Sequence, residues 1–323
     1  MPTRTTPPRR FEPRASWWGP ESPMSLIDEL IAKGPVLLDG AWGTELQARG
    51  LAAGEVPDLW NLEHPERVEE VARAYVEAGS DIILTNTFRA NSIALAEQAE
   101  ASKLDQVNQA GVEISKRAAG ERALVFASIG PSGKLLMNGQ VDGASLHAAF
   151  EQQARALAAG GADGIVVETM SDLEEARFAI DAARTTGLPV VACMAYDSGK
   201  QKDRTMMGTT PEQAAEVLTA AGADVIGANC GNGIEGYIPV CERISSATDR
   251  PVWVKANAGL PTLEGSKVVY RTTPNEFASR LDELIDAGAS FIGGCCGTTP
   301  AFISALRKRL GGGDGPAASN HVE

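Results

Sequence analysis

The sequence is poor in histidine and in aromatic residues, and it has too few basic residues to balance its acidic ones. Three histidines stand among 323 residues, aromatic residues make up 5%, and the formal net charge is −13. A chain this acidic lacks the basic face that a phosphate backbone requires, so we expect no nucleic-acid partner. His64 stands at a predicted helix start, His147 in a predicted helix and His321 in the tail, which argues against a histidine-based metal site.

Long hydrophobic runs are also missing. No apolar run approaches the ~18 residues that span a bilayer, and residues 1–23 contain no hydrophobic segment of the signal-peptide type. We therefore expect a cytoplasmic protein that does not associate with a membrane. The five cysteines are odd in number and unevenly spaced, unlike a secreted disulfide framework, which favours metal binding or catalysis.

One folded domain is predicted between two flexible ends. Residues 1–23 are rich in proline and arginine and predict a disordered leader, and residues 312–323 have the composition of a flexible tail. The intervening stretch, 24–311, is long enough for one α/β barrel of roughly 250 residues. The sequence leaves open whether the leader is present in the mature protein.

A repeated pattern supports a (β/α)8 TIM barrel. Helical stretches end in Ala-Gly or Gly-Gly, and a short apolar run follows near residues 82, 164, 225 and 290. Glycine suits the left-handed position after a helix, and an apolar run without alternation suits a parallel strand that is buried on both faces. The alternative is a doubly wound open sheet, but no Gly-x-Gly-x-x-Gly follows a strand, so its dinucleotide-binding version has no support.

Eight strands are predicted near 36–39, 82–86, 123–128, 164–168, 189–195, 225–229, 251–257 and 290–294. Helical stretches are predicted to follow them near 65–77, 92–119, 143–160, 171–186, 211–221, 236–247, 274–286 and 300–310. In such barrels the reactive residues lie at the carboxyl ends of the strands.

Three cysteines lie where predicted strands end and glycines follow: Cys230, Cys295 and Cys296. Buried structural cysteines are one interpretation, and it is the one we adopt for Cys193 and Cys241. A vicinal pair with a third thiol at another strand end instead predicts a trigonal zinc site with an open fourth position. Zinc-bound thiolates remain electron-rich, which suits attack on an electrophilic carbon better than activation of water.

Two buried carboxylates stand at the same predicted rim. Glu168 ends an apolar run and is predicted to hold a substrate ammonium group, or else to form a salt bridge with a barrel lysine such as Lys255. For Asp39 the same two roles are open, which are binding the substrate and forming a salt bridge with a barrel lysine. The backbone N–H groups of Gly40 and Ala41 could receive a carboxylate, although close packing also explains a glycine there.

Further polar residues follow the other strands. Thr85 and Thr87 offer hydroxyl groups, and the segments Ser128-Ile-Gly-Pro-Ser-Gly and Asn257-Ala-Gly complete the rim. With Leu38-Asp-Gly-Ala-Trp-Gly-Thr and Gly293-Gly-Cys-Cys-Gly-Thr-Thr-Pro, these segments resemble the homocysteine S-methyltransferase family. The likeness is greatest to the homocysteine-binding barrel of cobalamin-dependent methionine synthase, and it covers about residues 24–310.

The resemblance implies a zinc ion held by the three cysteines, with homocysteine sulfur as the fourth ligand. It implies that Asn257 approaches the metal when substrate is absent. It also implies that the amino-acid end of homocysteine is held by Asp39, Gly40, Ala41, Thr85, Thr87, Ser128 and Glu168. The expected product is methionine.

The methyl donor is the main question that the resemblance leaves open. The chain contains no Asp-x-His-x-x-Gly cobalamin motif and stops just after the barrel, so we expect no turnover on 5-methyltetrahydrofolate alone. S-methylmethionine, betaine and methylcobalamin supplied by a separate corrinoid protein are the candidates. The alternatives are a methyltransferase for another small thiol, a barrel subunit of a corrinoid-dependent complex, and a zinc-binding protein without catalysis. The sequence does not indicate the oligomeric state.

Overall fold

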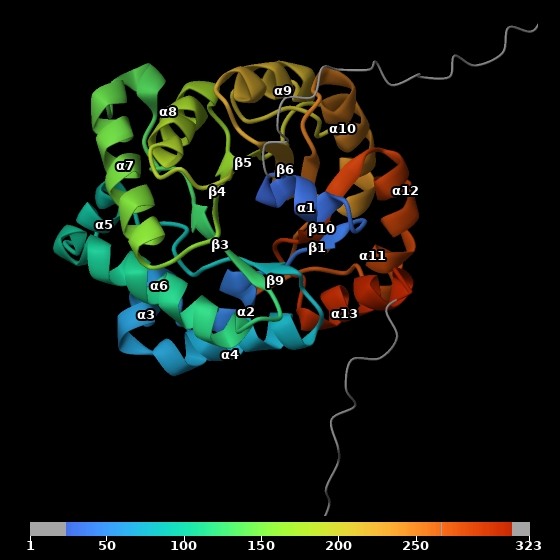
Figure 1. Ribbon diagram of the computed structural model, residues 1–323, viewed down its shortest axis with the longest axis horizontal. Coiled ribbons are helices and arrows are strands. Elements are labelled where there is room, and N and C mark those ends of the chain that lie inside the picture. The colour runs from blue at the N-terminus through green and yellow to red at the C-terminus, as the bar shows by residue number, and fades with distance from the viewer. Residues whose placement is uncertain (1–23, 266, 312–323) are drawn as a thin grey trace, which may run out of the picture.

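Eight parallel strands form a nearly closed barrel, and helices cover its outside (Figure 1). The computed structural model describes residues 24–265 and 267–311. Around the barrel the strands follow the order β1, β10, β7, β6, β5, β4, β3, β2. They are β1 (Val36–Leu37), β2 (Ile82–Ile83), β3 (Leu124–Ile129), β4 (Gly164–Met170), β5 (Val190–Met194), β6 (Val225–Gly233), β7 (Val252–Asn257) and β10 (Ala289–Gly294).

This architecture confirms the predicted (β/α)8 TIM barrel. The main outer helices are α4 (Pro65–Glu77), α6 (Leu104–Ala119), α7 (Gly143–Ala159), α8 (Leu173–Arg184), α9 (Pro211–Ala220), α10 (Ile234–Ala247) and α13 (Pro300–Arg309). The predicted leader at 1–23 and tail at 312–323 lie outside the described residues. Within those residues no helix combines the length and the hydropathy needed to cross a membrane.

Two of the predicted helical stretches are interrupted. The stretch 92–119 contains α5 (Ser92–Ala96), a 3-10 turn η2 (Ala101–Lys103) and then α6, with Ala99 between them at φ 59°. A left-handed residue cannot continue an α-helix, so the chain turns there. The stretch 274–286 divides at Arg280 into α11 (Pro274–Ser279) and α12 (Leu281–Asp286).

The sequence patterns did not reveal several short elements. These are α2 (Trp42–Ala48), the 3-10 turns η1 (Pro57–Leu59) and η3 (Leu136–Asn138), α3 (Trp60–Glu63), and a hairpin made of β8 (Thr262–Glu264) and β9 (Lys267–Val269). The helix-start signal that the sequence carries at Ser25 is confirmed, because Ser25 is the N-cap of α1 (Leu26–Ile31). Helix α1 packs its Ile27 against the cluster inside the barrel, and Figure 1 shows it over the centre of the ring of strands. It therefore covers one end of the barrel, and the site described below lies at the other end.

Aspartates at the recurring helix-to-strand junctions join neighbouring strands. Asp81 accepts the N–H of Leu37 at 2.8 Å, and Asp163 accepts the N–H of Val125 at 2.8 Å. Asp224 receives the N–H of Val190 in the same way, at 2.8 Å. Each carboxylate pairs a backbone donor at the start of the preceding strand, which would otherwise be unsatisfied. The recurring junction thus ties each of these strands to its neighbour at the amino ends of the strands.

The interior of the barrel is packed so tightly that a single methyl group is expected to disturb it. A Cβ atom on Gly227 of β6 would lie 2.2 Å from the carbonyl oxygen of Trp253. We expect Gly227→Ala to lower the free energy of unfolding by about 1–3 kcal/mol, measured by urea denaturation. Gly43→Ala is the control, because nothing lies within 4 Å of its Cβ position. Equal stability of the two variants would contradict this account of the packing.

Candidate active site

The three predicted thiols meet at the carboxyl ends of β6 and β10, the two strands that flank β7. Their Sγ atoms all lie within 4.8 Å of one another, and those of Cys230 and Cys296 are 3.7 Å apart. Within the described residues, they form the one group of three or more His, Cys, Asp or Glu side chains whose ligand atoms lie close enough together to hold a metal ion. Two cysteines that the sequence assigned to the core, Cys193 and Cys241, are buried elsewhere.

Backbone contacts hold the thiols in this arrangement. The N–H of Cys295 donates to the carbonyl of Ala256 at 2.7 Å, and the carbonyl of Cys296 accepts the N–H of Ala258 at 2.9 Å. The carbonyl of Cys230 accepts a hydrogen bond from the hydroxyl of Tyr237. Cys230 itself has φ 61°, a left-handed conformation that non-glycine residues adopt rarely and that is found at functional sites. The cluster is therefore held by the backbone of β6, β7 and β10.

The contacts among the thiols shift the pKa values of Cys295 and Cys296 in opposite directions. Hydrogen bonds with Cys230 and Cys295 lower the pKa of Cys296 to about 3, although burial opposes this. The pKa of Cys295 is raised far above its usual value, first by its hydrogen bond with Cys230. One thiol therefore becomes anionic readily while its neighbours donate to it. The thiolate is the form of cysteine that binds a metal ion.

A buried amide oxygen at the carboxyl end of β7, the strand between β6 and β10, has no hydrogen-bond partner among the described residues. Asn257 is 3% exposed, and its Oδ1 atom is buried without a partner in the described part of the chain. It follows Ala256 and precedes Ala258, the two residues whose backbones bond to the cysteine pair. A buried acceptor that is left unsatisfied requires an explanation, and a nearby cation supplies one.

Glu168 lies in the cavity wall beside the thiols. It is 7% exposed and accepts hydrogen bonds from the hydroxyl of Ser128 at 2.5 Å and from the amide of Asn229 at 3.1 Å. Burial raises its pKa, and the charge of Lys255 partly offsets that effect. Lys255 forms its direct ion pair with Asp39, so Glu168 is left able to accept a ligand's charge.

Asp39 is occupied by the protein itself. Besides Lys255, it accepts the indole N–H of Trp42 at 2.7 Å and the backbone N–H of Leu84 at 2.7 Å. Its side chain is fully buried and does not line the cavity. The sequence left open whether the salt bridge to Lys255 belongs to Glu168 or to Asp39, and the structure gives it to Asp39.

The hydroxyl groups form a chain behind the cavity wall. Thr85 Oγ1 lies 2.6 Å from Thr87 Oγ1 and accepts the N–H of Ser128 at 3.1 Å. Thr87 donates to the carbonyl of Ser128 at 2.8 Å. These bonds join β3 to the loop after β2. Thr87 is therefore a support for Thr85 and Ser128 rather than part of the cavity surface.

A cavity of about 330 Å³ opens beside the thiols. Eight residues predicted for the site line it, which are Gly40, Ala41, Thr85, Ser128, Glu168, Cys230, Cys295 and Cys296. Asp39, Thr87 and Asn257 lie behind its surface. The N–H of Ala41 already donates to the carbonyl of Thr298 at 3.0 Å, so it is not available to a ligand carboxylate.

Other lining residues were not identified as site residues from the sequence. Behind the lining, Asn229 was not identified either, and its hydrogen bond to Glu168 depends on β4 and β6 lying close together. Asp58 and Trp42 lie in short helical elements of the long loop after β1, and Phe88 and Arg89 lie in the loop after β2. The segments around Asp58 carry no motif that would have revealed it.

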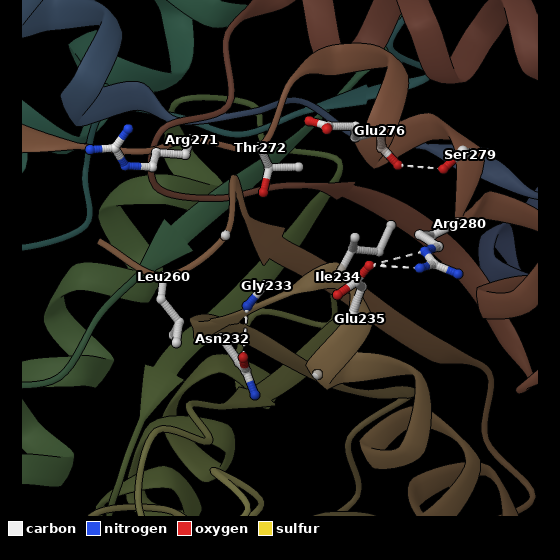
Figure 2. Close-up of a pocket in the computed structure, with 12 residues that line it drawn as sticks. Asn232, Gly233, Ile234, Glu235, Leu260, Arg271, Thr272, Glu276, Ser279 and Arg280 are labelled. Atoms are coloured by element: carbon white, nitrogen blue, oxygen red, sulfur yellow. Dashed lines mark hydrogen bonds and ion pairs between the residues drawn. The ribbon is translucent and has the colours of Figure 1, made fainter. Parts of the chain in front are cut away.

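A second, larger pocket of about 570 Å³ lies beside the β8–β9 hairpin and contains none of the predicted site residues. Figure 2 shows Glu235 and Arg280 paired on one side of it, at 2.8 Å, with Arg271 pointing away from them. The backbone carbonyl of Glu276 is also occupied, by the hydroxyl of Ser279. The charged side chains of this pocket are largely paired. The pocket therefore offers fewer free reactive groups than the thiol-lined cavity does.

The comparison with known proteins agrees with this geometry. Residues 36–310 match the family described as homocysteine S-methyltransferase. The chain is 32% identical to the methionine synthase of Mycobacterium tuberculosis over 291 residues, 85% of this chain and 24% of that protein. It is 31% identical to the methionine synthase of Mycobacterium leprae over 313 residues, 91% of this chain and 26% of that protein. The chain thus spans about a quarter of the length of these relatives.

Among solved structures, the chain is similar to the homocysteine methyltransferase MmuM of Escherichia coli, in a crystal structure of its metallated form. The TM-score is 0.73 at 25% sequence identity, covering 88% of this chain and 99% of that one. The family match covers nearly the whole barrel, including every strand that carries a thiol. The chain therefore belongs to the homocysteine S-methyltransferase family.

Proposed function

We propose that this chain is a zinc-dependent enzyme that methylates the sulfur of homocysteine and forms methionine. The observation that supports this most is the convergence of three thiols on a cavity that also contains the buried carboxylate Glu168. The proposed zinc ligands are Cys230, Cys295 and Cys296. The proposed location is the cytoplasm.

The donor set fits zinc. Three cysteine sulfurs and one open position make a tetrahedral site of the catalytic type, and Asn257, whose side-chain oxygen has no partner in the described residues, lies between the two residues that bond to the cysteine pair. When bound, zinc would keep the homocysteine thiol deprotonated at neutral pH. The surrounding hydrogen bonds to the cysteine backbones would keep the ligand geometry constant during turnover.

The protein's own residues would orient the substrate. Glu168 is held by Ser128 and Asn229 and would receive the ammonium group of homocysteine. Gly40 and Thr85 line the cavity nearby and would contact its carboxylate. In the transfer, a carbon–sulfur bond forms between the homocysteine sulfur and the methyl carbon. The bond from that carbon to the donor breaks, and its electron pair leaves with the donor.

Glu168→Gln tests the assignment of the ammonium group. The variant keeps the shape of the side chain and removes its charge, so we expect the KM for homocysteine to rise roughly ten- to a hundredfold. The zinc content should be unchanged, because Glu168 is not among the proposed ligands. A variant that loses its metal, or that unfolds at a much lower denaturant concentration, would show that Glu168 is structural.

The overall proposal is tested by the purified chain with zinc and homocysteine. Methionine is measured with S-methylmethionine, betaine or methylcobalamin as the donor, and zinc is quantified in the same preparation. Methionine formation with any of these donors is expected. If none gives methionine and homocysteine does not bind to the zinc-loaded chain, the proposal is wrong.

A second candidate is that the chain acts as the methyl-accepting subunit of a corrinoid-dependent complex. The length of the two methionine synthases favours this, because the matched barrel makes up about a quarter of each. In that case the isolated chain would turn over only when a separate methylated corrinoid protein is added. Activity of the chain alone with a small donor would exclude this candidate.

A further inference from the structure

Two strands of the barrel leave their regular pairing where they reach the cavity. The register of β4 against β5 shifts over the interval that contains Glu168 and Thr169. The register of β6 against β7 shifts over the interval that contains Cys230. Thr169 and Cys230 are both left-handed there, at φ 60° and 61°. Irregularities of this kind re-aim side chains, and these two present the proposed ammonium-binding carboxylate and a proposed zinc ligand to one cavity.

A single side chain joins the two irregular segments. Asn229, which precedes Cys230, is fully buried. Its Oδ1 atom accepts the backbone N–H of Thr169 at 2.7 Å. Its Nδ2 atom donates to the hydroxyl of Thr169 at 2.7 Å and to the carboxylate of Glu168 at 3.1 Å. The amide of Asn229 thus connects the strand that carries a zinc ligand to the strand that carries the carboxylate.

The orientation of this amide is determined by its partners. A backbone N–H can only donate, so the oxygen of Asn229 must face Thr169, and the nitrogen is left to face Glu168. A side-chain amide has two N–H donors, which the hydroxyl of Thr169 and the carboxylate of Glu168 use. The sulfur of Cys295 lies 4.0 Å from the same nitrogen. These contacts therefore fix the carboxylate relative to the thiol cluster in one arrangement.

The strand that lies between them, β5, ends too early to make this connection. Its last residue, Met194, pairs with Ala228 of β6, so Asn229 lies just beyond the end of β5. Strands β4 and β6 are not neighbours in the order around the barrel, and sheet pairing therefore does not join their ends. The side chain of Asn229 makes the connection instead.

We propose that Asn229 is a positioning residue that sets the distance between the ammonium-binding carboxylate and the thiol cluster. It thereby selects thiols whose ammonium group is placed as it is in homocysteine. The inference rests on the proposed function and deepens it, because it names the residue that makes the site specific for one amino thiol. Ser128 also holds Glu168, at 2.5 Å, but from β3, which lies on the other side of β4 from β6.

Three small thiols separate the effects of charge and distance. Homocysteine and 4-mercaptobutyrate have the same chain and carboxylate, and only homocysteine has the ammonium group. Cysteine has the ammonium group but one methylene fewer between it and the sulfur. A carboxylate held at a fixed distance from the thiol cluster favours homocysteine over both other thiols, and a carboxylate that is free to move loses part of that preference.

Asn229→Ala in the zinc-loaded full chain tests the proposal, with thiol binding measured by isothermal titration calorimetry and no methyl donor present. The preference for homocysteine is expressed as the Kd of each other thiol divided by that of homocysteine, and we expect both ratios to fall at least about tenfold. Partial loss of zinc does not alter these ratios, because all three thiols bind the same zinc-loaded fraction.

The matched control is Asn108→Ala. Asn108 is also fully buried, and its amide donates to the carbonyls of Ala90 and Leu104 outside the cavity lining. Its removal should change the two ratios by less than about twofold, whatever it costs in stability. A fall in the ratios that is equal in both variants would show that any buried amide has this effect, and it would overturn the inference.

A double-mutant cycle shows whether Asn229 acts through the carboxylate. In the Glu168→Gln background, Asn229→Ala should change the ratios by less than about twofold, because the charge that Asn229 positions is already gone. Equal losses in the two backgrounds would contradict the proposed role.

A second pair of variants serves if Asn229→Ala does not fold. Thr169→Val removes the hydroxyl that receives the amide of Asn229 and should lower both ratios at least about threefold, whereas Thr169→Ser keeps the hydroxyl and should stay within about twofold of the unaltered protein. If the preference for homocysteine survives Asn229→Ala or, where that variant does not fold, Thr169→Val, the inference is wrong and the proposed function stands. If the unaltered protein does not prefer homocysteine to 4-mercaptobutyrate, the proposed role of Glu168 is itself wrong.

Discussion

Alanine at Cys230, Cys295 or Cys296 is expected to reduce bound zinc from about one ion per chain to nearly none, and methionine formation with it. The reason is that two sulfurs cannot hold the ion with the open fourth position that the substrate thiol requires. The backbone that surrounds the thiols would keep the remaining pair in place, so the barrel should still fold. Metal analysis after dialysis against a mild chelator measures the loss, and circular dichroism confirms the fold.

The matched control for this experiment is Cys241→Ala. Its sulfur is buried between α10 and the chain near Ala287, whose carbonyl lies 3.6 Å away, and it does not line the cavity. It should therefore keep its zinc, whatever it loses in stability. Retention of zinc by all three cluster variants, or loss of zinc by this control alone, would show that the metal is held elsewhere.

Lys255→Met is expected to have the largest effect on stability, lowering the free energy of unfolding by about 3–5 kcal/mol. Lys255 is 2% exposed, and its removal leaves the fully buried Asp39 without its ion pair. The indole of Trp42 and the N–H of Leu84 would still donate to Asp39, but neither carries a charge. Urea denaturation followed by tryptophan fluorescence measures the change.

A second substitution tests whether the unpaired charge is the cause. Asp39→Asn in the Lys255→Met background removes the stranded carboxylate and should recover a substantial part of the lost stability. A single variant that costs less than about 1 kcal/mol would contradict the account, because that is the range of exposed ion pairs. So would a double variant no more stable than the single one.

Much of the site could be predicted because parallel strands of a barrel end at one face. Cys230 and the cysteine pair are 65 residues apart in the sequence. Because each follows an apolar strand, the sequence was enough to predict that they meet at one end of the barrel. The barrel and the family predicted from these patterns are confirmed. The metal and the roles of individual residues in binding homocysteine stay predictions.

The elements that the patterns did not reveal have a common feature. The hairpin of β8 and β9, the turn η1 and helix α2 are all short and lie in loops on the carboxyl side of the strands. Short segments provide too few residues for a hydrophobic period to be recognised. Their conformations depend on contacts with distant loops, such as that of Asp58 with the backbone of Arg89.

The sequence by itself determined the barrel, its helix-to-strand junctions and the grouping of three thiols at one rim. These features follow from local rules, which are glycine after a helix, apolar runs in buried strands, and polar residues where the strands end. Only the tertiary structure decided which carboxylate pairs with Lys255 and which remains free for a ligand. Asp39 and Glu168 are equivalent in the sequence, since each ends a buried strand. The choice between them depends on which side chains of neighbouring strands reach them, and that geometry exists only when the barrel has closed.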